Sequence, residues 1–360
     1  MALTLDAVMT ALRSVQEPDL KKDVLSLSMV RDLKIDGDAV SLRLAMPTPM
    51  RPVQPIIQNA VRDALARIGA KHIEMKVDSS VPEKGRPAPA KQGVPGIKHI
   101  IAVTSGKGGV GKSTVAANLA TALAQQGSKV GLLDSDVYGP NIPTMMGIHE
   151  LPSARQEEGR GELIIPLEAY GVKVMSMGFL TKGDQPLVWR GPMLHSVVNQ
   201  FLMNVDWGQL DYLVVDMPPG TGDVQLSLTQ LVPVSGAVVV TTPQEVSLQD
   251  VRKAILMFEK VSVPILGIVE NMSFFICDGC DKRHAIFGTG GGQRLADKFR
   301  TRLLAELPLS SAVREAGDAG APIVVREPES VQAKAFNELA RSVTSSLLAA
   351  TTQQVQVDEF

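Results

Sequence analysis

A glycine-rich stretch at residues 106–114 has the residue types and the spacing of a phosphate-binding loop. It fits the pattern G-x-x-x-x-G-K-[ST]. Its glycines allow backbone N–H groups to turn toward a polyphosphate, Lys112 can reach the β and γ phosphates, and the Ser113 hydroxyl can coordinate Mg²⁺. The stretch therefore predicts an ATP and magnesium site, with these nucleotide-binding residues: Gly106, Gly108, Gly109, Val110, Gly111, Lys112, Ser113 and Thr114.

The elements on either side of this loop are those that a phosphate-binding loop requires. An apolar run within residues 99–104 predicts a buried strand before the loop. Residues 113–126 predict a helix after it, with Gly127 as its C-cap. The helical spacing is carried by Val115, Leu119 and Leu123. This context favours a nucleotide site over a glycine-rich turn without a ligand.

Lys107 is a second lysine in the loop, at a position where the loop geometry does not require a cation. It could be a solvated side chain. A cation beside a phosphate site is more useful near the phosphates of another subunit, because Lys112 already serves its own loop. In this respect the loop resembles the deviant Walker A family, which includes the nitrogenase iron protein, MinD and the ParA ATPases. The resemblance implies a homodimer in which Lys107 and Lys112 both act in catalysis.

Two further strands are predicted to end in carboxylates. Residues 130–133 lead into Asp134 and Asp136, and residues 212–215 lead into Asp216. Asp216 suits a magnesium carboxylate, because it closes an apolar run beside the loop. In relatives, the aspartate at the place of Asp136 orients the attacking water. The alternative for both is a helix N-cap, and Asp134 and Asp223 are weaker candidates.

Asn271 follows a predicted strand at residues 265–269. Relatives place an asparagine here to hydrogen-bond the adenine edge of ATP. The alternative is an asparagine that stabilises a turn.

Cys277 and Cys280 are the two cysteines of the chain, at C-x-x-C spacing. They can share one metal centre but cannot complete it, because zinc or an iron-sulfur cluster takes four protein ligands. A two-fold axis would bring two pairs together around one 4Fe-4S cluster. The alternatives are a zinc ion with His284 as a further ligand, a thioredoxin-like redox pair, and thiols without a ligand.

Residues 98 to about 345 resemble the Mrp/ApbC family of iron-sulfur cluster carrier ATPases. The motifs that carry the resemblance are the loop with Lys107, residues 134–141, 189–193, 216–223 and 270–273, and the glycine-rich stretch 286–292. The resemblance implies a homodimer that binds a labile cluster at the paired cysteines. It also implies transfer of the cluster to apo-proteins, coupled to slow ATP hydrolysis.

The composition is that of a globular protein. Hydrophobic residues make up 44% of the 360 residues and charged residues 21%, with a net charge of −2. Aromatic residues are only 4%, so a stacking surface for single-stranded nucleic acid is not indicated. We expect no binding to nucleic acid or membrane. Without a signal peptide pattern or a long apolar run, a cytoplasmic protein is expected.

The chain is predicted to hold two domains. Residues 1–80 show the periodicities of helix, strand, strand, helix, strand in a small α+β domain, and residues 81–97 form a proline-rich linker. Residues 98–350 alternate strands and helices, which predicts an α/β P-loop NTPase with a mostly parallel sheet covered on both faces. Residues 351–360 are expected to be a tail.

The N-terminal domain resembles the small domain of iron-sulfur assembly factors. The resemblance rests on residues 17–20, 23–27 and 29–30 and on Thr48 and Pro49. That family commonly carries a cysteine shortly after the threonine, where this chain has Met50, Arg51 and Pro52. Thiol chemistry is therefore not expected in this domain, and a docking role stays open.

Two other functions compete with that of a cluster carrier. A positioning ATPase of the MinD or ParA type would need a membrane-binding tail or a basic face for DNA. Residues 351–360 are acidic and only weakly amphipathic, which disfavours the membrane version. A reductase like the nitrogenase iron protein would hold its cluster stably and pass on electrons.

Overall fold

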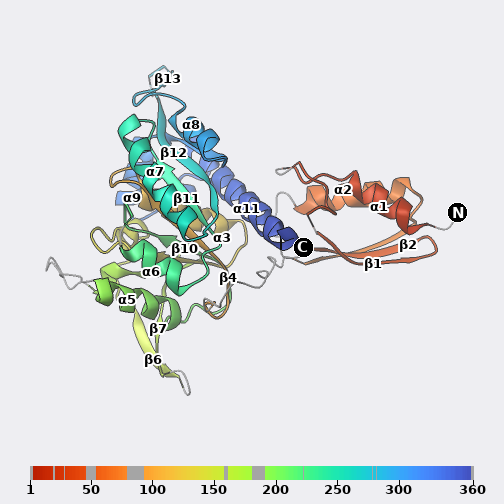
Figure 1. Ribbon diagram of the computed structural model, residues 1–360, viewed down its shortest axis with the longest axis horizontal. Coiled ribbons are helices and arrows are strands. Elements are labelled where there is room, and N and C mark those ends of the chain that lie inside the picture. Colours follow the sequence, from red (N-terminus) through yellow and green to blue (C-terminus); the bar gives the residue numbers. More distant parts are fainter. Residues whose placement is uncertain are drawn as a thin grey trace. The chain divides into compact units, whose positions relative to one another are not determined.

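A computed structural model describes residues 3–18, 21–27, 29–45, 54–78, 93–157, 161–180, 191–221, 223–277, 279–280 and 282–357 (Figure 1). The chain divides into two compact units. The first contains residues 1–86 with 126–128 and 344–360, and the second contains residues 87–125 and 129–343. Within the described ranges, no helix combines the length and the apolar character needed to cross a bilayer.

The N-terminal unit is a three-stranded sheet with two helices. Its elements are α1 (Leu5–Arg13), β1 (Val30–Asp36), β2 (Ala39–Ala45), α2 (Gln54–Arg67) and β3 (His72–Asp78). β2 pairs antiparallel with β1 and parallel with β3. The Thr4 hydroxyl caps α1 by accepting a hydrogen bond from the Ala7 amide. The order helix, strand, strand, helix, strand is the predicted one.

The second unit is built on a sheet of nine described strands in the order β13-β12-β11-β4-β10-β5-β9-β8, with β14 paired to β12. The strands are β4 (Ile97–Ser105), β5 (Val130–Asp134), β8 (Leu167–Ala169), β9 (Val172–Ser176), β10 (Leu210–Asp216), β11 (Gly236–Thr241), β12 (Ile265–Ile276), β13 (Arg283–His284) and β14 (Leu303–Leu309). β8 and β13 are antiparallel to their neighbours, and the other pairs are parallel. β6 (Ser153–Glu157) and β7 (Gly161–Ile165) form a separate hairpin.

Helices pack against this sheet on its two faces, as Figure 1 shows. The helices of this unit are α3 (Lys112–Gln125), α4 (Ile142–Met145), α5 (Gly191–Met203), α6 (Asp223–Leu231), α7 (Glu245–Lys260), α8 (Gly291–Lys298), α9 (Ser311–Asp318), α10 (Ile323–Arg326) and the first part of α11 (Val331–Val357), whose residues 344–357 belong to the first unit, with a 3₁₀ turn at Met177–Leu180. Leu213 and Val215 of β10 join a buried cluster with residues of α5 and α6. A second cluster joins α7 and α8 to β11 and β12. The predicted α/β fold with a mostly parallel, covered sheet is confirmed.

The parallel strands bring the candidate nucleotide residues to one edge of the sheet. Asp216, the last residue of β10, is in register with Asp134 of β5 and with Val103 of β4, three residues before Gly106. All seven residues of β10 are buried, as expected for a central parallel strand. Ligands of open α/β sheets bind at the carboxyl ends of the strands, and this is where these residues lie.

Two elements differ from the prediction. β12 does not end at residue 269 but continues to Ile276, so Asn271 lies within the strand. Met272 adopts a left-handed φ of 54°, and the pairing with β14 shifts register there. Because of this irregularity, the side chains do not alternate regularly between the two faces, and the alternation in the sequence does not predict the second half of the strand. α11 continues to Val357, so residues 351–357 are helical and not a tail. Most of the predicted linker, residues 48–52 and residues 189–190 lie outside the described ranges.

Candidate functional site

The predicted phosphate-binding loop joins β4 to α3 and needs glycine at two crowded positions. Gly111 has a left-handed φ of 80°, and a side chain there would collide with the Asn271 amide. A side chain at Gly106 would collide with the backbone of Asp250 and Val251 in α7. The loop is therefore packed between β12 and α7, and its conformation is fixed from both sides.

Lys112, the first residue of α3, lies in a buried cluster of polar groups. Its ammonium is 2.6 Å from an Asp216 oxygen and 3.5 Å from an Asp136 oxygen, and it donates to the Ser113 hydroxyl at 3.2 Å. Each of the three charged side chains is at most 10% exposed. Four of the predicted ATP and magnesium residues, Lys112, Ser113, Asp136 and Asp216, therefore lie together.

The Asp216 carboxylate has the features of a magnesium ligand. Burial raises the pKa of Asp216, and the adjacent Lys112 ammonium opposes that rise. Its second oxygen, Oδ2, is buried and accepts no hydrogen bond from the described residues. A buried carboxylate oxygen of this kind beside the Ser113 hydroxyl forms the oxygen donor set that Mg²⁺ prefers. The residues present fit the ion.

Asp136 is not a helix N-cap. Its Oδ1 accepts a hydrogen bond from the Tyr138 amide at 3.3 Å, and the next helix begins only at Ile142. Asp134 serves that helix instead, because its Oδ2 accepts from the Ile142 amide at 3.3 Å and from the Ser176 hydroxyl at 2.8 Å. Burial and the Asp216 carboxylate raise the pKa of Asp134 to about 8. Asp134 thus anchors the loop that presents Asp136.

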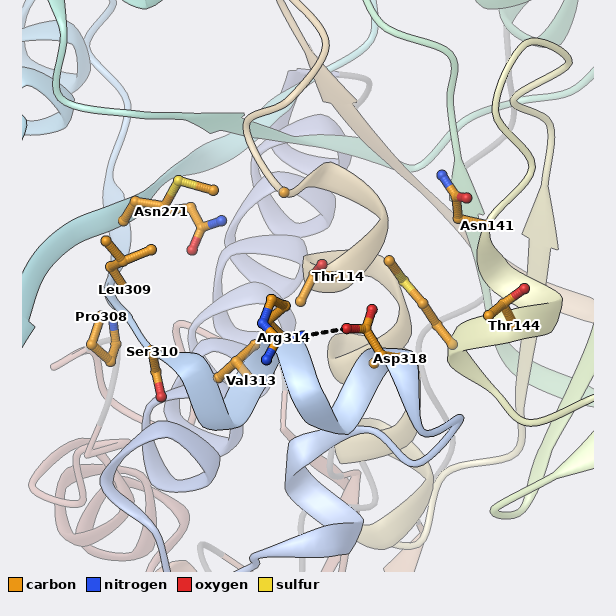
Figure 2. A pocket seen from close by; sticks show the side chains of 14 residues that line it. Thr114, Asn141, Thr144, Asn271, Pro308, Leu309, Ser310, Val313, Arg314 and Asp318 are labelled. Atoms are coloured by element: carbon orange, nitrogen blue, oxygen red, sulfur yellow. Dashed lines mark hydrogen bonds and ion pairs between the residues drawn. The ribbon is translucent and has the colours of Figure 1, made fainter.

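A cavity of about 300 Å³ opens beside the loop. Figure 2 shows Asn271 and Leu309 on one side of it, Asn141 and Thr144 on the other, and Thr114 between them. The remaining wall comes from residues 308–318, which end β14 and form α9, and Arg314 and Asp318 form an ion pair at 2.6 Å there. The cavity meets the phosphate loop at Gly111, so a nucleoside could occupy it while its phosphates enter the loop.

Asn271 has a contact that its predicted role did not include. Its side-chain Nδ2 donates to the carbonyl of Val110 at 2.8 Å, within the phosphate-binding loop. It also lines the cavity, where its side chain could contact a nucleotide base. The alternative of an isolated turn asparagine does not apply, because Asn271 lies within β12.

Lys107 is partly exposed at the outer end of the loop. Within the described ranges its ammonium has no ion-pair partner, while its carbonyl accepts a hydrogen bond from the Ser105 hydroxyl at 3.0 Å. Among the described residues, the Lys107 ammonium therefore forms no ion pair with its own subunit.

Cys277 and Cys280 lie at the turn between β12 and β13, which Figure 1 shows at one extremity of the second unit. Cys277 is half-buried and Cys280 is exposed. Two backbone bonds shape the turn: the Cys280 amide donates to the Cys277 carbonyl at 3.3 Å, and the Cys277 amide donates to the Lys282 carbonyl at 3.0 Å. The turn presents two cysteine side chains at the surface.

A complete metal site does not form among the described residues. No group of three or more potential histidine, cysteine or carboxylate ligands is found in that part of the chain. His284 pairs with Phe275 in the hairpin and does not join the cysteines in such a group. The cysteine pair therefore needs ligands from elsewhere to hold a metal centre.

Glu270 is a buried residue of the site region to which the sequence assigned no role, although it begins the motif at residues 270–273. Its carboxylate accepts a hydrogen bond from the Ser273 hydroxyl at 2.6 Å and another from the amide of Gly292, at the start of α8. The bond with Gly292 links the two ends of the segment that carries the cysteines, residues 271–291, which we call the cysteine excursion. The signals in the sequence are the motif at residues 270–273 and an acidic residue after an apolar run, whereas its partners Ser273 and Gly292 are seen only in the fold.

Replacing Asp216 with asparagine tests the magnesium assignment. We expect magnesium-dependent hydrolysis to fall by about a hundredfold or more, because a neutral amide cannot balance the ion's charge. The matched control is Asp211→Asn in the same strand, since Asp211 bonds Lys98 at 3.0 Å and the Lys129 amide at 2.8 Å, away from the loop. Steady-state phosphate release against magnesium concentration is the measurement. Equal losses in both variants would contradict the assignment.

Sequence comparisons cover both units. Residues 96–344 match a family described as NUBPL iron-transfer P-loop NTPase, and residues 5–77 match a family described as iron-sulfur cluster assembly protein. The "Iron-sulfur cluster carrier protein" of Synechocystis is 49% identical over 347 residues, which cover 96% of this chain and 98% of that protein.

Solved structures agree for the second unit. A nucleotide-binding protein from Archaeoglobus fulgidus, in complex with ADP, is 40% identical with a TM-score of 0.58 and covers 68% of this chain and 93% of its own. The cell division ATPase MinD of Pyrococcus furiosus is 26% identical with a TM-score of 0.51, over 69% of this chain and 98% of its own. The chain therefore belongs to the family of NUBPL-type iron-transfer P-loop NTPases, here joined to an iron-sulfur cluster assembly domain.

Proposed function

We propose that this protein is an iron-sulfur cluster carrier that uses ATP to control the binding and release of its cargo. The observation that carries the proposal is the pair Cys277 and Cys280 at an exposed turn of the unit that holds the phosphate-binding loop. The high identity to a cluster carrier over nearly the whole chain supports it. The cluster is cargo, and the chain's own chemistry is thiolate ligation and nucleotide hydrolysis.

The proposed carrier is a homodimer, because one chain has too few thiols to hold a cluster. One chain offers two cysteines, whereas a 4Fe-4S cluster takes four thiolates. A two-fold axis through the cysteine turns would supply two pairs, and closed two-fold dimers are the commonest assemblies. The same axis would give Lys107 the nucleotide partner that it lacks within the described part of its own subunit.

The buried cluster around Lys112 is where ATP would be hydrolysed. Loop amides and Lys112 bind the phosphates, while Ser113 and Asp216 hold Mg²⁺, which balances phosphate charge when bound. Asp136 lies 3.5 Å from the Lys112 ammonium and is placed to orient water. Asn271 and the adjacent cavity hold the adenine end, and the ADP complex of the Archaeoglobus protein supports such a site.

Hydrolysis in this scheme is slow and serves transfer. A switch that changes the affinity of the cysteine turn for its cargo needs only one turnover for each delivery. The partners are cluster donors and apo-proteins that require a cluster. Reduced thiols at an exposed turn suit the cytoplasm, where we place the protein.

Cluster transfer is the direct test of this function. Protein loaded anaerobically with iron and sulfide is mixed with an apo-enzyme that needs a 4Fe-4S cluster, and enzyme activity is followed with and without Mg-ATP. We expect activation that depends on the loaded carrier and changes in rate with ATP. A cluster that cycles between redox states without leaving the protein would favour the reductase instead.

A further inference from the structure

The segment after Asp216 is poor in backbone hydrogen-bond donors. Pro218 and Pro219 lack an amide N–H, so this loop cannot close on itself with the usual turn bonds. Pro218 is nevertheless buried and Gly220 is half-buried. Their carbonyls need donors from elsewhere, because a buried carbonyl without a partner destabilises the fold.

Gln225 supplies those donors. Its side-chain Nε2 donates to the Pro218 carbonyl at 2.6 Å and to the Gly220 carbonyl at 3.1 Å. The side chain is fully buried in the first turn of α6, and its amide oxygen accepts no hydrogen bond from the described residues. A fully buried glutamine that bonds two carbonyls of one loop fixes the position of that loop.

The loop is also tied to both other parts of the nucleotide site. The Gly220 amide donates to the Ser105 carbonyl at 2.9 Å, at the end of β4. The Asp216 carbonyl accepts from the Ser135 hydroxyl at 2.8 Å and from the Ser135 amide at 2.9 Å. A displacement of residues 216–220 would therefore reach the segment that carries Asp136 and the entry to the phosphate loop.

We propose that Gln225 is a positioning residue for ATP hydrolysis, which holds the loop after Asp216 in the geometry that hydrolysis needs. The inference rests on the proposed ATPase activity and is independent of cluster binding. Nucleotide affinity depends mainly on residues 106–114 and on the cavity, so the loss of Gln225 reduces turnover more than binding. Gln225 is not among the residues that line the cavity, and its two hydrogen bonds go to the loop after Asp216, so it acts through the backbone of that loop.

The test compares Gln225→Met with Gln225→Glu. Methionine fills the same volume without a donor, and we expect kcat to fall about tenfold while the Kd of an ATP analogue stays within about twofold. Glutamate can donate only when it is protonated. The ratio of its kcat to that of the wild type should therefore rise as the pH falls, whereas the ratio for methionine should stay flat.

The matched control is Gln125→Met, because the Gln125 side chain also donates to a backbone carbonyl, that of Val324 at 3.0 Å, at the end of α3 away from the loop. Thermal unfolding identifies the folded variants. Wild-type kcat in the folded Gln225→Met variant, a kcat ratio of folded Gln225→Glu that does not change with pH, or the same loss in the Gln125 control, would overturn the inference. A wild type without ATPase activity would instead refute the proposed function.

Discussion

Replacing Cys277 or Cys280 with alanine is expected to abolish cluster binding. Each substitution leaves a dimer with two thiolates in place of four, and a 4Fe-4S cluster is not held by two. We expect about four iron atoms per wild-type dimer after anaerobic reconstitution, and a decrease of about tenfold or more in either variant. Iron and sulfide analysis with visible absorbance makes the measurement.

His284→Ala is the control for this prediction, because His284 is exposed in the same hairpin and is the further ligand that a zinc site would use. It should bind as much iron as the wild type. A colourless wild type, or equal iron in the cysteine variants, would refute the carrier function. Loss of a bound zinc ion in all three variants would establish the zinc alternative.

Replacing Lys107 with alanine is expected to separate nucleotide binding from hydrolysis. In the proposed site, the loop amides and Lys112 make the phosphate contacts within one subunit, so the Kd for ATP should change little. Hydrolysis should fall by about a hundredfold or more, as it does when a cation supplied by a partner subunit is lost. The two measurements are the steady-state rate of phosphate release and the Kd for ATP from equilibrium binding.

Lys334→Ala provides the comparison, since Lys334 of α11 is exposed and pairs with Glu329, which precedes the helix, at 3.3 Å. It removes one charge without reaching the loop and should hydrolyse ATP at the wild-type rate. Unchanged hydrolysis in Lys107→Ala would remove the role of Lys107 across subunits and leave it a solvated side chain.

The elements next to the phosphate loop could be predicted because their signals are local. A buried apolar run before the loop, helical spacing after it and a carboxylate at the end of β10 are properties of short segments. The register of parallel strands then brings Asp216 and Asp134 to the same edge. The motif thus predicts most of the polar cluster around Lys112.

Contacts between distant segments could not be predicted in this way. The bond from Asn271 to Val110 joins residues 161 positions apart, and it depends on the close approach of β12 to Gly111. The bonds of Gln225 to Pro218 and Gly220 are close in sequence, but they depend on how α6 packs. The spacing of residues in the sequence does not specify such contacts, because the same spacing is compatible with many folds in which these side chains have other partners.

β12 is the element that relates the two halves of the proposed function. Asn271 bonds the phosphate loop, and Cys277 follows six residues later, directly after the strand ends. Glu270 holds the other end of the cysteine excursion at Gly292. The cysteine turn is therefore connected, through neighbouring residues of β12, to the predicted phosphate-binding loop.

The cluster content of a mixed dimer tests the central claim, that two subunits share one cluster, most directly. Wild-type chains and chains with both cysteines replaced by alanine are coexpressed with different tags, and the mixed dimer is isolated by two successive affinity steps. After anaerobic reconstitution, we predict essentially no cluster in the mixed dimer, because it holds only one cysteine pair. A mixed dimer with about half the iron of the wild type would contradict the claim, since each chain would then hold a centre of its own.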